Sequence, residues 1–73
     1  MDEMEGFGKR LRNLRQDRGL TQVELGNRSG ISQKDISKYE RGTTANLLAT
    51  NLIRLADALG VSVDYLLGRV DHE

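Results

Sequence analysis

Between residues 32 and 38 the chain carries five polar side chains that are not acidic, namely Ser32, Gln33, Lys34, Ser37 and Lys38, and one acid, Asp35. A glutamine amide can bond to N6 and N7 of adenine together, a lysine ammonium can donate to O6 and N7 of guanine, and a serine hydroxyl can bond to either kind of base. Asp35 could accept from N4 of cytosine, but we favour a role in the first turn of a helix. The pattern therefore suits base edges, although a merely solvated polar helix face would also fit.

Cysteine and histidine, which many catalytic and metal sites use, are nearly absent. There is no cysteine, which excludes a disulfide framework, a thiolate nucleophile and a Cys-based zinc site. The only histidine, His72, lies one residue from the C-terminus, and the carboxylates are scattered over different predicted helices. We expect no enzymatic activity, no metal, no cofactor and no small-molecule ligand.

Charge is unevenly distributed along the chain although its total is zero. Eleven Lys and Arg balance eleven Asp and Glu, which at first argues against a polyanionic partner. Residues 6–42 nevertheless hold nine bases and four acids, a net +5, whereas residues 1–5 sum to −3 and residues 43–73 to −2. A basic block on short helices is the electrostatic pattern of a DNA-binding surface. Solvated faces with interspersed ion pairs are the alternative.

Glycines punctuate a chain that has no proline and few aromatic residues, a composition that indicates an all-α fold. Glycine after a run of helix formers usually ends a helix in the left-handed conformation. The first helix is predicted from Phe7, with apolar side chains at i, i+4 and i+7. A second helix begins after Thr21, which forms a capping box with Glu24. The glycines that end the predicted helices are Gly19, Gly30, Gly42, Gly60 and Gly68.

Three further short helices are predicted from N-cap residues and apolar periodicity. Ser32 is the N-cap of the third helix, and Asn46 ends a polar loop as the cap of the fourth. The fourth helix has the strongest periodicity, because its apolar residues from Leu48 to Leu59 repeat at +4, +3 and +4. Ser62 caps a fifth short helix.

The segment from Thr21 to Glu40 contains two of these helices, joined by Ser29-Gly30-Ile31. Two helices joined by a short turn with glycine form a helix-turn-helix, whose second helix can project into a DNA major groove. Gly26 would let the two helices approach closely, and apolar contacts would fix their crossing angle. An ordinary corner between two helices is the alternative.

From Phe7 to Leu67, about 61 residues, the sequence resembles the lambda-repressor-like helix-turn-helix domains of the phage Cro and CI type, the XRE family. The resemblance implies a compact five-helix DNA-binding domain over residues 6–68, with the helix-turn-helix at 21–40. Residues 1–5 are expected to be a disordered tail and residues 69–73 a C-terminal tail. The stretches that carry the resemblance are LRNLRQDRGLTQVELGNRSGIS, DISKYERG and LIRLADALGVSVDYLLG.

The resemblance also implies which residues contact DNA. Gln22 matches a glutamine that holds a phosphate and braces the start of the recognition helix. The loop after that helix is implied to contact the phosphate backbone through main-chain N–H groups and short polar side chains, which fixes register without reading sequence. The implied base contacts are Ser32, Gln33, Lys34, Ser37 and Lys38, and the implied loop contacts are Arg41, Gly42, Thr43, Thr44 and Asn46.

The resemblance also implies one ion pair, and the sequence departs from the family pattern in one stretch. Arg15 and Glu40 match positions that form a partly buried ion pair in several members, so we expect the same pair here. Many members have Asn-Pro-Ser and a large apolar residue before the fourth helix, whereas this chain has Asn46-Leu47-Leu48-Ala49. The resemblance therefore does not fix where the fourth helix begins or how its start packs.

Family members commonly dimerise through the fourth and fifth helices, and a two-fold dimer places two recognition helices about 34 Å apart, one turn of B-DNA. The end of this chain has more apolar side chains than one short helix can bury. We expect a homodimer interface formed by Val63, Leu66, Leu67 and Val70. The alternative, that Leu66 and the valines close the monomer core, holds in part and would leave Leu67 or Val70 for the partner.

Together these features predict a cytoplasmic, homodimeric transcriptional regulator that binds double-stranded DNA in the major groove, with repression at a palindromic operator as its expected action. No apolar run reaches the roughly 18 residues of a transmembrane helix, and the first residues do not resemble a signal peptide. A protein-interaction module of the same fold, such as an antitoxin, is the alternative. The acid-poor recognition face argues against that as the sole role.

Overall fold

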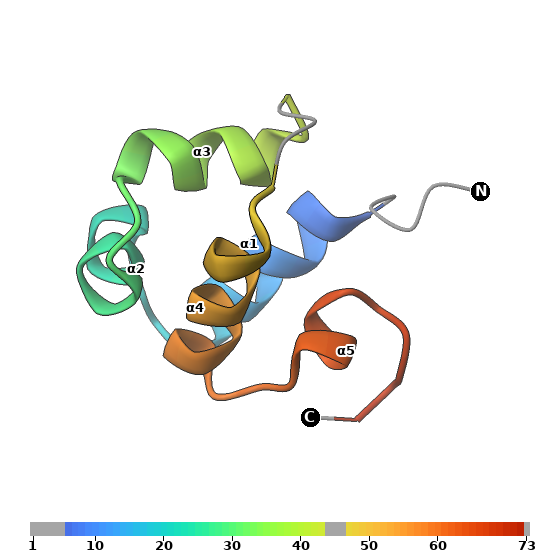
Figure 1. Cartoon of the computed structure of the whole chain (residues 1–73). Helices are drawn as coiled ribbons and strands as arrows, with labels where there is room; N and C mark the ends of the chain where they lie inside the picture. The colour runs from blue at the N-terminus through green and yellow to red at the C-terminus, as the bar shows by residue number, and fades with distance from the viewer. Residues whose placement is uncertain (1–5, 44–46, 73) are drawn as a thin grey trace.

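A computed structural model describes residues 6–43 and 47–72 of the chain. These residues form five α-helices and no strands: α1 (Phe7–Asp17), α2 (Gln22–Ser29), α3 (Gln33–Arg41), α4 (Ala49–Leu59) and α5 (Val63–Leu66). Figure 1 shows α2 and α3 meeting at a corner, with α5 at the opposite end of the molecule from α3. The predicted all-α, five-helix fold is confirmed. None of the described helices is long and apolar enough to cross a membrane.

Local sequence explains where three of the helices begin. Thr21 and Glu24 form the full capping box of α2, each side chain accepting from the other residue's main-chain N–H. The Ser32 hydroxyl accepts from the N–H of Asp35 at the start of α3, and Ser62 does the same for Tyr65 at the start of α5. These caps lie where the sequence predicted them.

The start of α4 differs from the prediction. The N-cap position is occupied by Leu48, which provides no side-chain hydrogen bond, and the first helical residue is Ala49. Asn46, the expected cap, lies outside the described residues. The side chain of Leu48 is 62% exposed, so it does not belong to the buried stripe of α4 as its spacing suggested. A residue at the N-cap position has extended backbone, which takes it off the helical periodicity.

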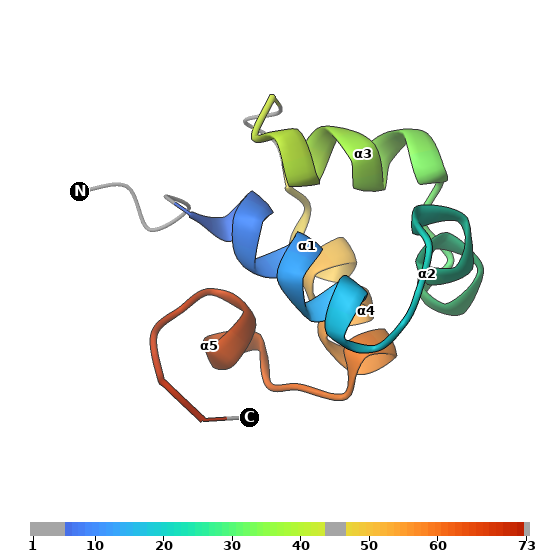
Figure 2. The same cartoon turned by 180° about the vertical axis from the view of Figure 1, so that it is seen from behind.

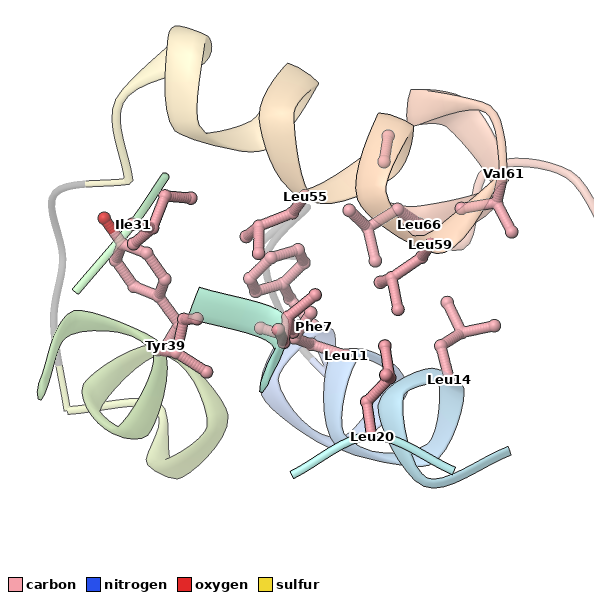
Figure 3. Packing of buried hydrophobic residues seen from close by; sticks show 13 residues of the cluster. Phe7, Leu11, Leu14, Leu20, Ile31, Tyr39, Leu55, Leu59, Val61 and Leu66 are labelled. Carbon is pink, nitrogen blue, oxygen red and sulfur yellow. The ribbon is translucent and has the colours of Figure 1, made fainter. Parts of the chain in front are cut away.

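The core draws residues from all five helices and from the turns between them (Figure 3). Apolar side chains of α1 pack against α3 on one side and against the C-terminal half on the other. Asn51 of α4 donates to the hydroxyl of buried Tyr39 at 2.9 Å, which ties α4 to α3. The fully buried large side chains are Leu11, Leu25, Ile36, Leu55 and Leu66.

Two glycines allow close approaches that place α3. A Cβ on Gly8 of α1 would lie 2.6 Å from the carbonyl oxygens of both Tyr39 and Glu40, so the main chains of α1 and α3 meet there. A Cβ on Gly26 would lie 2.8 Å from the carbonyl oxygen of Ile31 in the turn between α2 and α3. Neither contact leaves room for a side chain, so both sites need glycine.

Candidate nucleic-acid interface

Helix α3 has one apolar face and one polar face. Ile36 and Tyr39 are buried in the core. The opposite face carries residues with the spacing i, i+3, i+4 and i+7, which places them in one row along the helix. This outer row consists of Lys34, Ser37, Lys38 and Arg41.

The residues predicted to contact bases differ in how much of their surface is exposed. Ser32, Gln33 and Lys34, at the start of α3, are exposed, whereas Ser37 and Lys38 are partly buried. The Ser32 hydroxyl already accepts from the N–H of Asp35 at 3.2 Å, so its oxygen caps the helix while its proton stays available as a donor. Ser32, Gln33 and Lys34 therefore lie at the start of α3, whereas Ser37 lies near its middle and Lys38 in its last turn.

Asp35 lies on the flank of α3 away from Gln33. A helical step of 100° per residue puts Asp35 on the other side of the buried Ile36 from Gln33 and Ser37. It is the acidic residue of the first turn, where a negative charge is stabilised by the helix dipole. This position suits the favoured role in the first turn better than contact with cytosine.

An unbroken chain of hydrogen bonds runs from α1 to the first turn of α3. The Arg15 guanidinium donates from Nε to Oε2 of Glu40 at 2.6 Å and from Nη2 to Oε1 at 3.0 Å. Gln22 Nε2 donates to the same Oε1 at 3.2 Å, and Gln33 Nε2 donates to Gln22 Oε1 at 3.0 Å. These hydrogen bonds therefore link the end of α3 to its beginning through Gln22 of α2.

The ion pair at the centre of this chain is largely buried. The Glu40 side chain is 4% exposed and the Arg15 side chain 12%. Arg15 also donates from Nη1 to the carbonyl oxygen of Leu20 at 2.7 Å. Hydrogen bonding to the Glu40 carboxylate raises the pKa of Arg15 above its ordinary value, against the opposing effect of burial. The Arg15 guanidinium thus stays charged, and the pair holds the ends of α1, α2 and α3 together.

The amide of Gln33 is oriented by its bond to Gln22. One hydrogen of Nε2 is used in that bond, which leaves the other hydrogen and Oε1 for a ligand. An amide with one free N–H and a free carbonyl oxygen can bond to N7 and N6 of adenine together. The network therefore presents Gln33 in a fixed orientation suited to base recognition.

The start of α2 offers main-chain donors beside this network. The N–H groups of Gln22 and Val23 have no acceptor within the described ranges, as expected for the first turn of a helix. The Gln22 side chain gives one hydrogen of Nε2 to Glu40 and accepts from Gln33 at Oε1, so its second Nε2 hydrogen and its main-chain N–H are the donors left for a phosphate. A helix N-terminus of this kind favours an anion.

The loop after α3 departs from the expected phosphate contacts. The N–H of Gly42 donates to Tyr39 O at 3.2 Å, and Thr43 donates to Lys38 O from its main chain at 3.1 Å and from its hydroxyl at 3.3 Å. These bonds close the C-terminus of α3, with Gly42 in the left-handed conformation. In this conformation the donors of Gly42 and Thr43 bond within the turn, so a phosphate contact by either residue stays a prediction that requires these bonds to break or to be shared.

Of the other loop candidates, Arg41 is exposed at the last position of α3. Thr44 and Asn46 lie outside the described residues. Arg41 is therefore the loop-side candidate that the structure supports for a phosphate contact.

The basic block of residues 6–42 is partly used within the molecule. Arg10 donates to the carbonyl oxygens of Leu66 and Leu67, Arg18 donates to Leu59 O at 3.1 Å, and Arg15 pairs with Glu40. Three arginines of the block therefore stabilise other parts of the fold. The bases on the outer row of α3 remain the cationic part of the candidate interface.

The residues predicted to form the dimer interface differ in how much of their surface is exposed. Leu66 has no exposed surface and packs in the monomer core, so its side chain offers nothing to a partner and that prediction is corrected. Val63, Leu67 and Val70 are partly buried and keep some surface. Leu66 and Leu67 are adjacent, so one turns inward on α5 while the next faces its flank.

Sequence reasoning missed several residues that place the site. Gly8 lies inside a predicted helix, and a glycine there is a signal of close main-chain approach that could have been used. The bond from Asn51 to Tyr39 and the caps made by Arg10 and Arg18 have no local signal, because their partners are far away in the sequence.

Comparison with known proteins places this geometry in a family. A helix-turn-helix family model matches residues 11–66, more than half of the chain. The chain is 45% identical over 62 residues to the HTH-type transcriptional regulator y4dJ of Sinorhizobium fredii, covering 85% of this chain and 79% of that protein. It is 38% identical over 69 residues to the transcriptional repressor RghR of Bacillus subtilis, covering 94% of this chain but 51% of RghR. The chain thus spans about half the length of that relative.

Solved structures agree with this placement. The restriction-modification controller protein C.AhdI of Aeromonas hydrophila superposes with a TM-score of 0.81 at 36% identity, over 86% of this chain and 94% of that one. The P22 c2 repressor, in complex with a synthetic operator, superposes with a TM-score of 0.76 at 38% identity, over 82% of this chain and 89% of that one. The chain belongs to the helix-turn-helix family of lambda-repressor-like, XRE-type transcriptional regulators.

Proposed function

We propose that this protein is a transcriptional regulator that binds double-stranded DNA sequence-specifically through α3 and acts in the cytoplasm, most simply as a repressor. The observation that carries the proposal is the polar outer side of α3, held in place by the bonded chain Arg15–Glu40–Gln22–Gln33. The P22 c2 repressor, which has the same fold, was solved with an operator. An ordered amide and two lysines on one helix form a surface suited to base edges in the major groove.

Each group in the site has a separate task in this proposal. Gln33 and Lys34 lie at the exposed start of α3, where a recognition helix contacts base edges. The free N–H groups at the start of α2 bind a phosphate, which sets the depth of α3 in the groove. Arg41 binds a second phosphate at the other end of α3 by charge. Base reading and phosphate binding are thus divided between different residues.

A homodimer is part of the proposal, because one short helix reads only a few base pairs. A two-fold pair would place two recognition helices about one turn of DNA apart and bind a palindrome. Val63, Leu67 and Val70 keep exposed apolar surface for this contact, and α4 adds Ile53, which is 52% exposed. Occlusion of a promoter by such a dimer would repress transcription.

Selection of bound sequences from random duplex DNA tests the proposal. We expect the purified chain to enrich a palindrome with half-sites about 10 base pairs apart, because the spacing follows from the dimer. A chain that enriches no sequence, and whose duplex binding does not weaken with salt, would contradict DNA recognition and favour a module that acts through a protein partner. Enrichment of a single half-site would support recognition of bases by α3 and contradict the dimer.

A further inference from the structure

Arg10 of α1 is bonded to the last turn of α5. Its Nε donates to the carbonyl oxygen of Leu66 at 3.1 Å, and its Nη2 donates to that of Leu67 at 2.7 Å. Carbonyl groups at the C-terminal end of a helix lack partners within the helix, and a cation suits the negative end of the helix dipole. Arg10 therefore supplies from α1 the C-terminal cap of α5.

Gly68 makes the space that this guanidinium occupies. A Cβ at residue 68 would lie 2.6 Å from Cζ of Arg10, 2.7 Å from Nη1 and 2.9 Å from Nε. Gly68 also has a φ of +78°, a conformation that side-chain-bearing residues rarely adopt. Arg10 and Gly68 thus form one structural unit, which we call the Arg10 clamp.

Helix α5 depends on such external support. It has four residues, and a single turn of helix does not persist in water on its own. Besides the Ser62 cap, Leu66 fixes it by burial in the core. A groove of about 200 Å³, lined in part by Arg10, Tyr65 and Gly68, lies between α1 and α5. Packing therefore leaves part of this boundary open, and the clamp bridges it.

The same helix that carries the clamp also contacts the recognition helix. Figure 2 shows α1 between α3 and α5. Gly8 lies against the carbonyl groups at the end of α3, and Arg15 pairs with Glu40 one residue before that end. A shift of α5 relative to α1 is thus a shift of α5 relative to α3.

We infer that Arg10 is a positioning residue that fixes α5 relative to α3, and so sets the distance between the two recognition helices of the dimer. The inference rests on the proposed function, since it concerns how two copies engage one operator. It needs arginine and not only a positive charge, because the planar guanidinium reaches two carbonyl groups at once while a lysine ammonium has a single nitrogen. Reading of one half-site by α3 does not depend on the clamp.

The test compares Arg10→Lys with the wild-type chain on two duplexes, the palindrome that the wild type selects and a duplex with one of its halves. We expect half-site affinity to stay within about twofold, while affinity for the palindrome falls about tenfold, because the single ammonium nitrogen cannot keep both charge-assisted hydrogen bonds in their present geometry. Sedimentation should show weaker self-association of the same variant. Gly68→Ala should reproduce both results, because its Cβ displaces the guanidinium. Arg12→Lys, on an exposed position of α1, is the matched control and should change neither.

Each outcome decides the inference. Equal losses of affinity for the palindrome and the half-site would overturn the inference. So would a variant in which both the ratio of these two affinities and the self-association are unchanged. A wild-type chain that remains monomeric would overturn it too. Thermal unfolding shows whether Arg10→Lys is folded at the assay temperature, and Gly68→Ala decides the question if it is not. A wild-type chain that binds no duplex would refute the proposed function alone, and sedimentation of the two variants would then decide the clamp.

Discussion

The two halves of this molecule are held together by different means. At the recognition helix, side chains bond to side chains in a continuous series from Arg15 to Gln33, through the buried carboxylate of Glu40. At α4 and α5, Arg18, directly after α1, and Arg10 of α1 bond to main-chain carbonyl groups, and apolar side chains such as Ile53 stay exposed. The first arrangement fixes the orientation of particular side chains. The second fixes where whole helices lie and leaves surface for another molecule.

The largest expected effect breaks the first arrangement at its centre. Glu40→Ala should lower the free energy of unfolding by about 3 kcal/mol, because it leaves the Arg15 guanidinium largely buried without its carboxylate. Urea unfolding measures this change. Asp57→Ala, an exposed carboxylate on α4, is the control and should stay within about 0.5 kcal/mol. A similar small loss for Glu40→Ala would show that the network does not stabilise the fold.

A second effect concerns base reading. Lys34→Ala should cost about 1–3 kcal/mol on the selected palindrome and relax the preference at one base pair, because its exposed ammonium lies on the outer row of α3. Competition binding with cognate and random duplexes measures both. Arg54→Ala, which removes an exposed charge from α4, should leave specificity unchanged. Equal losses on cognate and random DNA would assign Lys34 to phosphate binding.

A third effect separates Arg41 from Thr43. Arg41→Ala should weaken binding to all duplexes alike and reduce the slope of log affinity against log salt by about one, because one phosphate contact is lost. Thr43→Ala should have little effect, because its donors are used within α3. Titrations at several salt concentrations compare the two. A larger effect of Thr43→Ala would mean that this loop rearranges on DNA.

The same contrast explains what could be predicted from sequence. The caps at Thr21 and Ser32 are local patterns, so the starts of α2 and α3 could be predicted from the sequence. The partners of the ion pair between Arg15 and Glu40 followed from the resemblance to the family. The start of α4 was not, because the chain departs there from the family. Leu66 was assigned to the dimer interface although it is buried. Successive residues of a helix point in different directions, and the packing of α5 against the other helices decides which of them faces the core.

The smallest expected effect is a pH dependence at the start of α2. Hydrogen bonds from the main chain and side chain of Thr21 lower the pKa of Glu24 below its ordinary value, with a smaller contribution from Arg28. A carboxyl whose folded pKa is depressed adds stability that is present above its unfolded pKa and is lost as pH falls through its folded pKa.

Glu24→Gln provides the matched comparison, because glutamine can form the same capping box without titrating. We expect the wild type to lose more stability than Glu24→Gln between neutral pH and pH 3 in urea unfolding, and the two to converge at the acid end. Parallel curves would show that the carboxylate gains nothing from the cap.

Because Glu24 is exposed and lies beside the N–H groups proposed to bind a phosphate, the same variant also tests whether its charge opposes DNA binding. Tighter duplex binding by Glu24→Gln at neutral pH would place the start of α2 against the phosphate backbone, whereas unchanged binding would place it away from the DNA.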